Sequence, residues 1–482
     1  AAESMTEKEL FKTIYQVTKK TRMPAYVVGG YIRDRLLESE KRKAKSEKDI
    51  DIVIDGSGIA FAKAFDEEVK QAGRLIEFAD FDTARYLLEE LEIEFAGARS
   101  ESYRSDSRKP NVVPATIEAD LGRRDFTVNA MAREVKARSL GQLIDPFSGE
   151  KDIKESILRT PLAPDETFFD DPLRMLRAAR FAAKLNFSIE RETLAGMERN
   201  AERLKIISAE RIKEELFKLL ATPVPSIGLW ILYGTKLLDQ FLPEVSLLSG
   251  VEEAFGYSHK DNLSHTFAVV DNIATRSDKI ILRYAGLMHD IAKPQTKKFI
   301  RGRGWTFDMH EHLGKKIAID IGRRLRFSTD ESKYVAKLIR WHLQPIALMD
   351  DGITDSAVRR LIVTLGDDLQ DLLILCRSDI TTGNQRKKAH RLQNYERLDK
   401  RIVEVIEKDK LRAFQSPVRG EEIMEICGLK PGPTIGKIKD AIEEAILSGE
   451  IPNEYEPAKE YFFRIKEKYL LDAEDWETVK KD

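Results

Sequence analysis

The sequence predicts an α+β protein, in which a head of mixed strands and helices precedes a longer all-helical region. Apolar runs with the spacing of strands alternate with helical stretches in the first part, at 25–30, 50–54 and 91–96. From Ile153 onward the spacing of apolar residues is almost wholly helical. A chain of 482 residues also exceeds what one hydrophobic core serves. We therefore expect four parts: head 1–150, neck 151–220, body 221–390 and tail 391–482.

Composition and charge narrow the class of protein. The chain has 80 Lys and Arg against 82 Asp and Glu, with 42% apolar residues. This balance is typical of a soluble globular protein, and it still allows a local basic stripe that binds nucleic acid. The apolar run 227–233 is far shorter than the roughly twenty residues of a membrane span, and the N-terminus has no leader pattern. Cys376 and Cys427 are far apart, so we expect a cytoplasmic protein without membrane contact, disulfide framework or cysteine-bound zinc.

Asp49 and Asp51 lie two apart in a predicted strand and therefore point to the same side. Carboxylate oxygens are the ligands that Mg²⁺ prefers, and a metal pair held in this way serves phosphoryl transfer. A pair of this kind is weak evidence alone, because most such pairs are solvated strand ends. Asp51, however, interrupts an apolar run and needs a partner or a metal there.

Gly29 and Gly30 follow the first predicted strand and precede a helix. They form either a simple tight turn or a place where backbone N–H groups approach a triphosphate at a helix N-terminus. Arg33 and Asp34 lie in the first turn of that helix. The position of the glycines, one helix before Asp49, favours the phosphate interpretation.

Two strings in the head carry a resemblance to a known family. Residues 28–37 read VGGYIRDRLL and are followed by DID at 49–51, which resembles the signature of class II CCA-adding tRNA nucleotidyltransferases and bacterial poly(A) polymerases. Residues 123–130, RRDFTVNA, resemble the family's second motif. The resemblance implies a polymerase-beta-like head in which Asp125 holds sugar hydroxyls and Arg124 a phosphate, with Asn129 in the same motif. A guanidinium fork suits a phosphate.

The family's third metal-binding carboxylate lies five residues before an arginine on a later strand. Glu94, with Arg99 five residues on, matches that place, and Glu92 has the same facing and competes for the role. Asp49, Asp51 and Glu94 are thus the expected catalytic residues. The polar, Arg-rich stretch Glu101–Leu121 resembles the flexible loop of complete CCA-adding enzymes.

The neck contains a candidate for base selection. Asp171 and Arg174 lie three apart beside Pro172, with Arg177 and Arg180 continuing the stripe. Spacing alone favours a surface ion pair. The string DDPLR at 170–174 nevertheless resembles the family's nucleotide-recognition motif, which usually begins with Glu rather than Asp. The resemblance implies that Asp171 and Arg174 read a base edge, and that the string ERI at 210–212 braces the neck.

The body holds metal-binding residue types in the order His, His-Asp, His, His, Asp. This order resembles the complete HD phosphohydrolase constellation, in which Lys293 matches a phosphate-neighbouring position and Ala292 replaces the usual glycine. Imidazole and carboxylate ligands suit Mn²⁺, Ni²⁺, Fe²⁺ or Zn²⁺. His312 is expected to be a neighbour only. The implied ligands are His265, His289, Asp290, His310, His342 and Asp379.

The tail offers two basic features, each of which is otherwise an ordinary solvated helix face. Gly432 to Gly436 precede a helix, so unpaired N–H groups beside Lys437 and Lys439 are expected to bind RNA phosphate. Residues 386–401 are rich in Lys and Arg, and suit contact with an RNA helix.

The function that the resemblance implies is addition of C, C and A to the tRNA 3′ end from CTP and ATP, with possible hydrolysis in the HD part. Two alternatives stay open. A poly(A) polymerase of the same family would share the head, and an HD phosphohydrolase could use the head only to bind RNA. The intact pair Asp49 and Asp51 is a feature that a mere binding module would not need.

Overall fold

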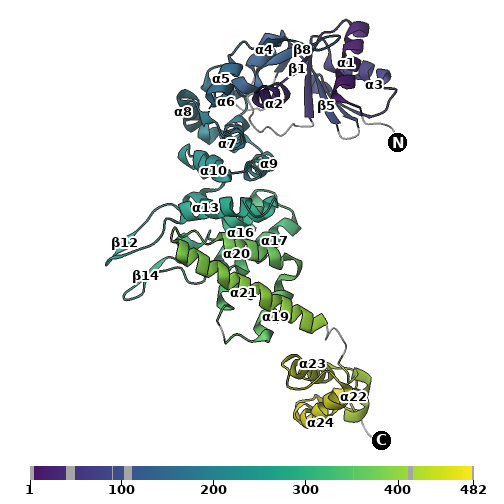
Figure 1. Ribbon diagram of the computed structural model, residues 1–482, viewed down its shortest axis with the longest axis vertical. Helices are drawn as coiled ribbons and strands as arrows, with labels where there is room; N and C mark the ends of the chain where they lie inside the picture. The colour runs from purple at the N-terminus through teal and green to yellow at the C-terminus, as the bar shows by residue number, and fades with distance from the viewer. Residues whose placement is uncertain are drawn as a thin grey trace. The chain divides into compact units, whose positions relative to one another are not determined.

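The computed structural model describes residues 5–39, 49–88, 91–102, 111–350, 352–410 and 416–479. It divides into two compact units, Ala1–Val335 and Ala336–Asp482. A mixed sheet near the N-terminus is followed by largely helical structure (Figure 1), which confirms the predicted α+β class. No helix in the described ranges is long and apolar enough to cross a membrane.

The head is built on a seven-stranded sheet of order β3-β4-β5-β2-β1-β8-β9. Its one parallel pairing joins β2 to β5, and its other pairs are antiparallel. The strands are β1 (Ala25–Val28), β2 (Asp49–Ile54), β3 (Arg74–Phe78), β4 (Thr83–Leu88), β5 (Leu91–Gly97), β8 (Ala132–Val135) and β9 (Leu140–Ile144). The small pair β6 (Arg99–Ser102) and β7 (Asn111–Pro114) lies outside this sheet.

The head helices begin and end where local signals place them. A capping box between Thr6 and Glu9 starts the first helix, and Ser57 caps the third. Figure 1 shows α1 beside α3, and the two helices pack together. The helices are α1 (Glu7–Thr21), α2 (Gly30–Ser39), α3 (Gly58–Glu68), α4 (Ile117–Gly122) and α5 (Gly149–Glu155).

The rest of the first unit is mostly helical. Its helices are α6 (Pro164–Asp170), α7 (Leu173–Leu185), α8 (Arg191–Asn200), α9 (Ala209–Leu220), α10 (Pro225–Gly234), α11 (Leu238–Phe241), α12 (Pro243–Ser246), α13 (Asn262–Ala274), α14 (Ile280–Met288), α15 (Lys293–Thr296) and α16 (His310–Arg324). Pro172 is the N-cap of α7 rather than its first residue.

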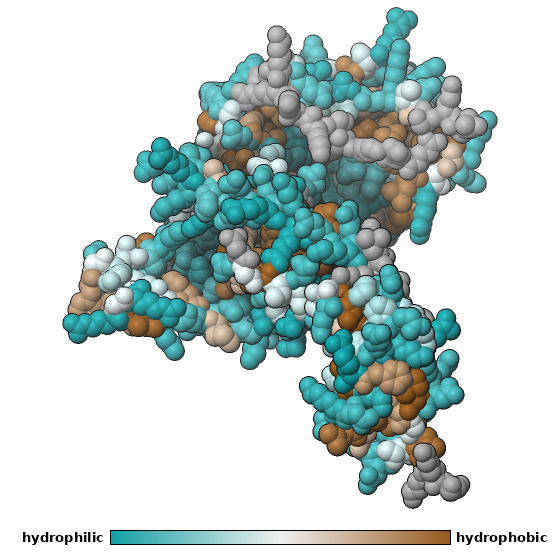
Figure 2. Space-filling view, turned by 60° about the horizontal axis from the view of Figure 1, so that its bottom comes forward, coloured by the Kyte–Doolittle hydropathy of each residue, from teal (hydrophilic) through white to brown (hydrophobic). Residues whose placement is uncertain are grey.

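Short strands also occur beyond the head, which the helical spacing of apolar residues did not predict. They form one parallel pair and two hairpins: β10 (Ile157–Leu158) with β11 (Ser188–Ile189), β12 (Glu253–Ala254) with β13 (Tyr257–Ser258), and β14 (Lys298–Ile300) with β15 (Gly304–Thr306). Both hairpins project from the body in Figure 1. Figure 2 shows brown, hydrophobic atoms beside teal, hydrophilic ones on the projection at the left.

The second unit begins within α17 (Thr329–Trp341) and is helical. An apolar core of α22, α23 and α24 includes Ile423, Ile438, Ile442 and Phe462, each fully buried. The helices are α18 (Gln344–Ala347), α19 (Asp355–Leu365), α20 (Leu369–Ser378), α21 (Gln385–Lys410), α22 (Gly420–Cys427), α23 (Pro433–Leu447) and α24 (Tyr455–Leu471).

Candidate active sites

A cavity of about 520 Å³ brings residues of the head and neck together. Eight basic side chains and four aspartates line it, so the balance of charge is positive and suits a triphosphate. We call it the nucleotide cavity. Its lining residues are Gly29, Gly30, Arg33, Asp49, Asp51, Arg123, Arg124, Asp125, Asn129, Asp171, Leu173, Arg174, Arg177, Arg180, Phe181, Arg211 and Lys218.

The predicted metal-binding carboxylates lie at the start of β2. Asp49 is exposed and Asp51 is half-buried. The parallel register places Glu94 of β5 next to Asp51 and Glu92 next to Asp49. Both glutamates also lie near Arg85, whose nitrogens are 3.5 Å from Glu94 and 3.3 Å from Glu92. Glu94 therefore adjoins the pair along the sheet, although it does not line the cavity itself.

Gly29 sits between the side chains of Asp51 and Arg124. Its φ of +71° is one that side-chain-bearing residues rarely adopt. A Cβ at this position would lie 3.4 Å from Asp51 Oδ2 and 3.6 Å from Arg124 Nη1. Gly30 begins α2, so the N-terminus of that helix opens into the same cavity. This geometry supports the phosphate interpretation of the two glycines.

A buried hydrogen-bond network links α2 to the second motif and the neck. Arg33, 1% exposed, donates to Asn129 Oδ1 at 2.7 Å, and Asn129 donates to Asp125 Oδ1 at 3.1 Å. Arg177 Nε donates to the other oxygen of Asp125 at 2.8 Å. Burial would raise the pKa of Asp125, but the Arg177 guanidinium and the Asn129 amide outweigh it and lower the pKa to about 2. Asp125 is thus a fixed anion facing the cavity.

The base-selection residues differ from the surface ion pair that spacing alone suggested. Arg174 is 9% exposed and donates to two backbone carbonyls, of Thr167 at 3.1 Å and of Arg123 at 2.6 Å. Asp171 accepts from the Leu173 N–H and pairs with Arg211 at 3.1 Å. These bonds use two of the five N–H groups of Arg174 and hold its guanidinium at the cavity wall.

Arg177 and Arg180 of α7 are fixed by a carboxylate on α9. Glu215, 4% exposed, accepts from Arg180 Nε at 2.8 Å and lies 3.8 Å from Arg177 Nη1. The Phe181 ring packs against the guanidinium groups of Arg33, Arg177 and Arg180, at 5.2, 5.4 and 4.4 Å from its centroid. These contacts therefore hold several guanidinium groups in fixed positions at one wall of the cavity.

A second site lies in the body, where His265, His289, Asp290 and His310 converge. We call these four residues the HD cluster. The Nε2 atoms of His289 and His310 are each 3.2 Å from an oxygen of Asp290, and that of His265 is 3.5 Å away. Exposure of the four residues ranges from 0 to 9%. Lys293 Nζ is 2.8 Å from the Asp290 carboxylate.

The histidines of the HD cluster are oriented as metal ligands usually are. Nδ1 of His289 lies 2.6 Å from the carbonyl of Gly286, and Nδ1 of His310 lies 2.8 Å from that of Phe307. With Nδ1–H donating to a carbonyl, each Nε2 keeps its lone pair for a cation. The ligand atoms of His265, His289 and Asp290 lie within 4.8 Å of one another, so these residues fit a divalent metal.

The other two expected ligands, His342 and Asp379, belong to the second unit. His342 is 3% exposed and directs Nδ1 to the carbonyl of Ile339 at 2.6 Å, the same arrangement as in the HD cluster. Asp379 follows α20. Their place in a metal sphere stays a prediction. His312 is exposed on α16 and lies 3.5 Å from Glu311, as expected of a neighbour.

The tail differs from the expected row of unpaired N–H groups. The Thr434 N–H, near the start of α23, donates to Glu477 Oε1 at 2.9 Å, and the Thr434 hydroxyl donates to Oε2 at 2.8 Å. Glu477 comes from a short 3₁₀ turn at the end of the chain and is 2% exposed. A carboxylate thus already caps this helix. Lys437 is exposed and Lys439 partly so, and both remain RNA-binding predictions.

Comparison with known proteins decides the family. Family models match residues 25–159 (poly A polymerase head domain), 186–248 (probable RNA and SrmB-binding site of polymerase A) and 262–377 (HD domain). The CC-adding tRNA nucleotidyltransferase of Thermus thermophilus is 30% identical over 89% of this chain and 90% of its own. The A-adding enzyme of Deinococcus radiodurans is 32% identical over 70% and 77%. The chain belongs to the tRNA nucleotidyltransferase family.

Further comparisons extend this result. The multifunctional CCA protein of Vibrio vulnificus is 31% identical to this tRNA nucleotidyltransferase over 78% of the chain and 89% of the relative. The fold matches the CCA-adding enzyme of Bacillus stearothermophilus in complex with CTP, with a TM-score of 0.66 at 21% identity over 97% and 100% of the two chains. The resemblance found in the sequence is confirmed, and a nucleotidyltransferase head of this type implies a divalent metal.

Several residues that line the cavity of this tRNA nucleotidyltransferase, or hold its lining side chains, were not predicted as site residues. Arg211, Glu215 and Lys218 lie on one face of α9, at i, i+4 and i+7, so helical spacing was the signal that could have revealed them. The fully buried Asp120 holds Arg123 at 3.1 Å and Arg124 at 3.2 Å. The predicted loop 101–121 lies partly outside the described residues, and its described ends form β6, β7 and α4.

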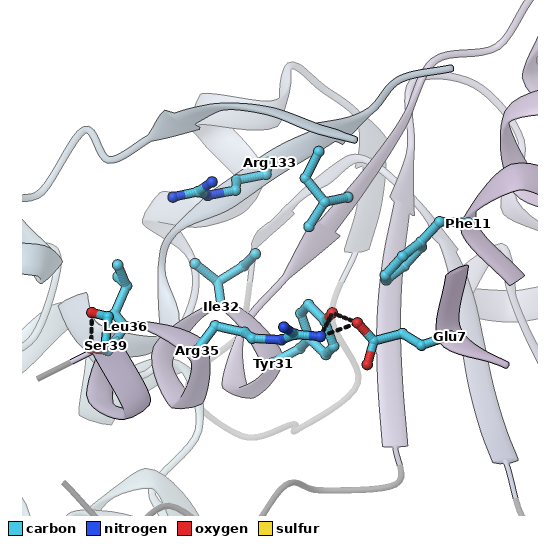
Figure 3. Close-up of a pocket in the computed structure, with 9 residues that line it drawn as sticks. Glu7, Phe11, Tyr31, Ile32, Arg35, Leu36, Ser39 and Arg133 are labelled. Carbon is cyan, nitrogen blue, oxygen red and sulfur yellow. Dashed lines mark hydrogen bonds and ion pairs between the residues drawn. The ribbon is translucent and has the colours of Figure 1, made fainter. Parts of the chain in front are cut away.

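The opposite face of α2 lines a separate cavity of about 400 Å³ (Figure 3). Glu7 of α1 bonds to both Tyr31 and Arg35, which point toward it in Figure 3. Burial and the bond to Glu7 raise the pKa of Tyr31. The apolar lining of this cavity comes from Phe11, Ile32, Leu36 and Leu140. This network ties α1 to α2 and helps to fix the helix that carries Arg33.

Proposed function

We propose that this tRNA nucleotidyltransferase adds C, C and A in turn to the tRNA 3′ end, using CTP and ATP and releasing pyrophosphate. The observation that carries the proposal is one cavity lined both by Asp49 and Asp51 and by Asp171 and Arg174. Bond formation and base selection can therefore act on the same bound nucleotide. Relatives with CC-adding and A-adding specificities both match, so full CCA addition rests on the likeness of residues 101–121 to the loop of complete enzymes.

In the proposed reaction the terminal 3′-hydroxyl attacks the α-phosphate, the new P–O bond forms, and the bond to pyrophosphate breaks. Asp49, Asp51 and Glu94 would hold Mg²⁺, which supplies charge neutralisation and activates the hydroxyl. Arg124 and the α2 N-terminus contact the triphosphate, and Asp125 accepts from the sugar hydroxyls. Asp171 accepts from, and Arg174 donates to, the base edge, because no nucleic-acid template is present to select it.

The test is nucleotide incorporation on three tRNA substrates that end before CCA, after the first C and after CC. Each substrate is incubated with CTP alone, ATP alone and both. We expect two C residues from CTP on the first substrate, one A from ATP on the third, and a complete end with both. A chain that stops after CC, or that extends only the third substrate, has a partial specificity. Continued adenylate addition to unrelated RNA would indicate a poly(A) polymerase instead.

A second activity is supported by the HD cluster and by Lys293, which lies beside it. We infer that the body hydrolyses a phosphodiester or a 2′,3′-cyclic phosphate, with water entering at phosphorus and one P–O bond opening to leave a hydroxyl. His265, His289, Asp290 and His310, with His342 and Asp379, would hold Mn²⁺, Ni²⁺, Fe²⁺ or Zn²⁺, which activates the water. Lys293 is suited to stabilise charge on a phosphoryl oxygen. Failure of the metal-loaded protein to hydrolyse these substrates would leave a structural metal site.

A further inference from the structure

The hairpin of β12 and β13 has an unusual residue in its turn. Phe255 and Gly256 connect β12 to β13 and both have positive φ, +49° and +78°. A two-residue turn of this kind favours Asn-Gly or Asp-Gly, and a bulky ring at its first position is strained. The Phe255 side chain is nevertheless 81% exposed and so gains little from burial in the protein. Local strain at a side chain that stays largely exposed points to a role in binding.

The second hairpin supports the first and supplies positive charge. Phe299 of β14 stacks on Phe255 with ring centroids 5.5 Å apart and an interplanar angle of 26°. A Cβ at Gly304 would come within 2.8 Å of the Tyr257 ring, so β15 lies tightly against β13. The loop of this hairpin is Arg301-Gly302-Arg303, with both arginines exposed. The two tips therefore form one mixed aromatic and basic surface.

A row of rings leads from this surface to the HD cluster. Phe299 lies 5.4 Å from Trp305, Trp305 lies 5.5 Å from His259, and His259 lies 5.8 Å from Phe307, measured between ring centroids. At the inner end, Lys293 Nζ is 5.5 Å from the Phe307 centroid and 2.8 Å from the Asp290 carboxylate. The exposed tip and the candidate metal centre are thus joined by adjacent side chains.

The cationic side chains along this row differ in whether they form ion pairs. Lys297 pairs with Glu252 and also lies over the Trp305 ring at 5.5 Å. Within the described part of the chain, Lys298 and Arg301 form no ion pair. Exposed aromatic rings interleaved with available cations are the pattern by which proteins bind single-stranded nucleic acid, because bases stack on rings and phosphates pair with cations.

We propose that the hairpins 253–258 and 298–306 form a stacking surface for the unpaired bases at an RNA 3′ end, and that this surface leads the end into the HD cluster. The proposal rests on the hydrolytic function proposed for that cluster and specifies its substrate as an RNA terminus rather than a free nucleotide. Phe255 and Phe299 stack on bases, and Lys298 and Arg301 contact phosphates. The cations Lys298 and Arg301 beside these rings, and the row of rings that ends at Lys293, favour a phosphate-bearing RNA end over a protein partner.

The test measures binding to a short single-stranded oligoribonucleotide that ends in a 2′,3′-cyclic phosphate. Such an end has no 3′-hydroxyl for the head to extend, and the oligonucleotide lacks the tRNA fold. Phe255→Asn removes the ring and favours the turn, so the hairpin stays folded. We expect Phe255→Asn to raise the Kd about tenfold, which corresponds to about 1.4 kcal/mol, and Phe255→Trp to keep wild-type affinity. Val363→Ala, an exposed apolar residue on α19, is the matched control.

Hydrolysis provides a second readout with a different pattern. Phe255→Asn should raise the KM for the oligonucleotide and leave kcat near its wild-type value, and the KM for a cyclic mononucleotide should not change. Equal affinity of wild type and Phe255→Asn for the oligonucleotide would overturn the stacking proposal. Binding is measured without turnover, so an inactive HD cluster would refute the hydrolase proposal without deciding this one.

Discussion

The nucleotide cavity and the HD cluster differ in how they present charge. In the cavity Asp49, a proposed metal ligand, is exposed and Asp51 is half-buried, and cations are fixed around them by buried carboxylates and carbonyls. In the cluster all four residues are at most 9% exposed, and a single carboxylate lies within 3.5 Å of three imidazole nitrogens and a lysine. The first arrangement suits a large anion that enters with its own metal, and the second suits a resident metal.

The nucleotide cavity and the HD cluster also differ in the contacts that orient their functional groups. The cavity depends on bonds between the head and the neck, such as that from Arg177 to Asp125. In the HD cluster, the rings of His289 and His310 are oriented by bonds to a carbonyl three residues earlier. We therefore expect the cavity to be sensitive to substitutions in either part, and the cluster to be sensitive mainly to its own residues.

The largest expected effect is at the metal-binding pair. Asp51→Ala should reduce nucleotide addition about a thousandfold or more, because charge neutralisation and positioning are lost together. Hydrolysis by the HD cluster should be unaffected. Incorporation of labelled CTP into tRNA measures the effect, with Asp55→Ala at the exposed far end of β2 as control. Activity of Asp51→Ala within tenfold of wild type would contradict the metal assignment.

The reciprocal change tests the second site. Asp290→Ala should abolish metal-dependent hydrolysis of a 2′,3′-cyclic phosphate and lower the metal content of the purified protein, because the carboxylate that lies among the three histidine nitrogens is removed. Nucleotide addition should continue at the wild-type rate. His312→Ala, outside the cluster, is the control. If Asp290→Ala also stopped nucleotide addition, the two sites would not be independent.

Base selection should respond less strongly than the chemical step. Arg174→Ala should lower kcat/KM for CTP and ATP about tenfold to a hundredfold and relax discrimination against UTP and GTP, because a donor to the base edge is lost while the carboxylates stay. Competition between nucleotides on one tRNA measures this. Arg199→Ala, which removes an exposed neck arginine, is the control. Unchanged preference in Arg174→Ala would remove Asp171 and Arg174 from base selection.

Local motifs made much of the cavity predictable, and long-range pairings made the rest unpredictable. Gly29, Asp49 and Asp51 follow from strand spacing and turn chemistry within one short segment. The bond from Arg180 to Glu215 joins residues 35 apart, and that from Thr434 to Glu477 joins residues 43 apart. Such pairs form only when helices pack, so no local pattern specifies them. The helix N-terminus at Thr434 was expected to be open for the same reason.

Glu215 tests whether the cavity depends on the neck to position its cations. Glu215→Gln keeps the shape and removes the charge that holds Arg180 and Arg177. We expect kcat/KM for both nucleotides to fall about tenfold, with the preference between CTP and ATP retained because Asp171 and Arg174 are untouched. Glu198→Gln, an exposed neck glutamate, is the control. A change in nucleotide preference would instead make Glu215 a selection residue.

The smallest effect concerns Asp170, whose pKa shifts in the opposite direction to that of Asp125. Burial, with the nearby carboxylates of Glu166 and Glu101, raises the pKa of Asp170 to about 6, despite the opposing charge of Arg174. In the unfolded chain this carboxyl titrates near its ordinary value of about 4. The folded state therefore binds the proton more tightly, and stability falls as the pH rises from about 4 to 6.

Asp170→Asn removes this titration and so isolates it. The side chain is only partly buried, so solvent screening reduces the effect to about 1 kcal/mol or less. We expect the difference in Tm between Asp170→Asn and wild type to shift in favour of the variant between pH 4 and 6 and to stay constant above pH 7. Asp165→Asn should show no such shift, because hydrogen bonds from Arg199 lower the pKa of that carboxyl. A pH-independent difference for Asp170→Asn would mean that the Asp170 carboxyl has the same pKa in the folded and the unfolded protein.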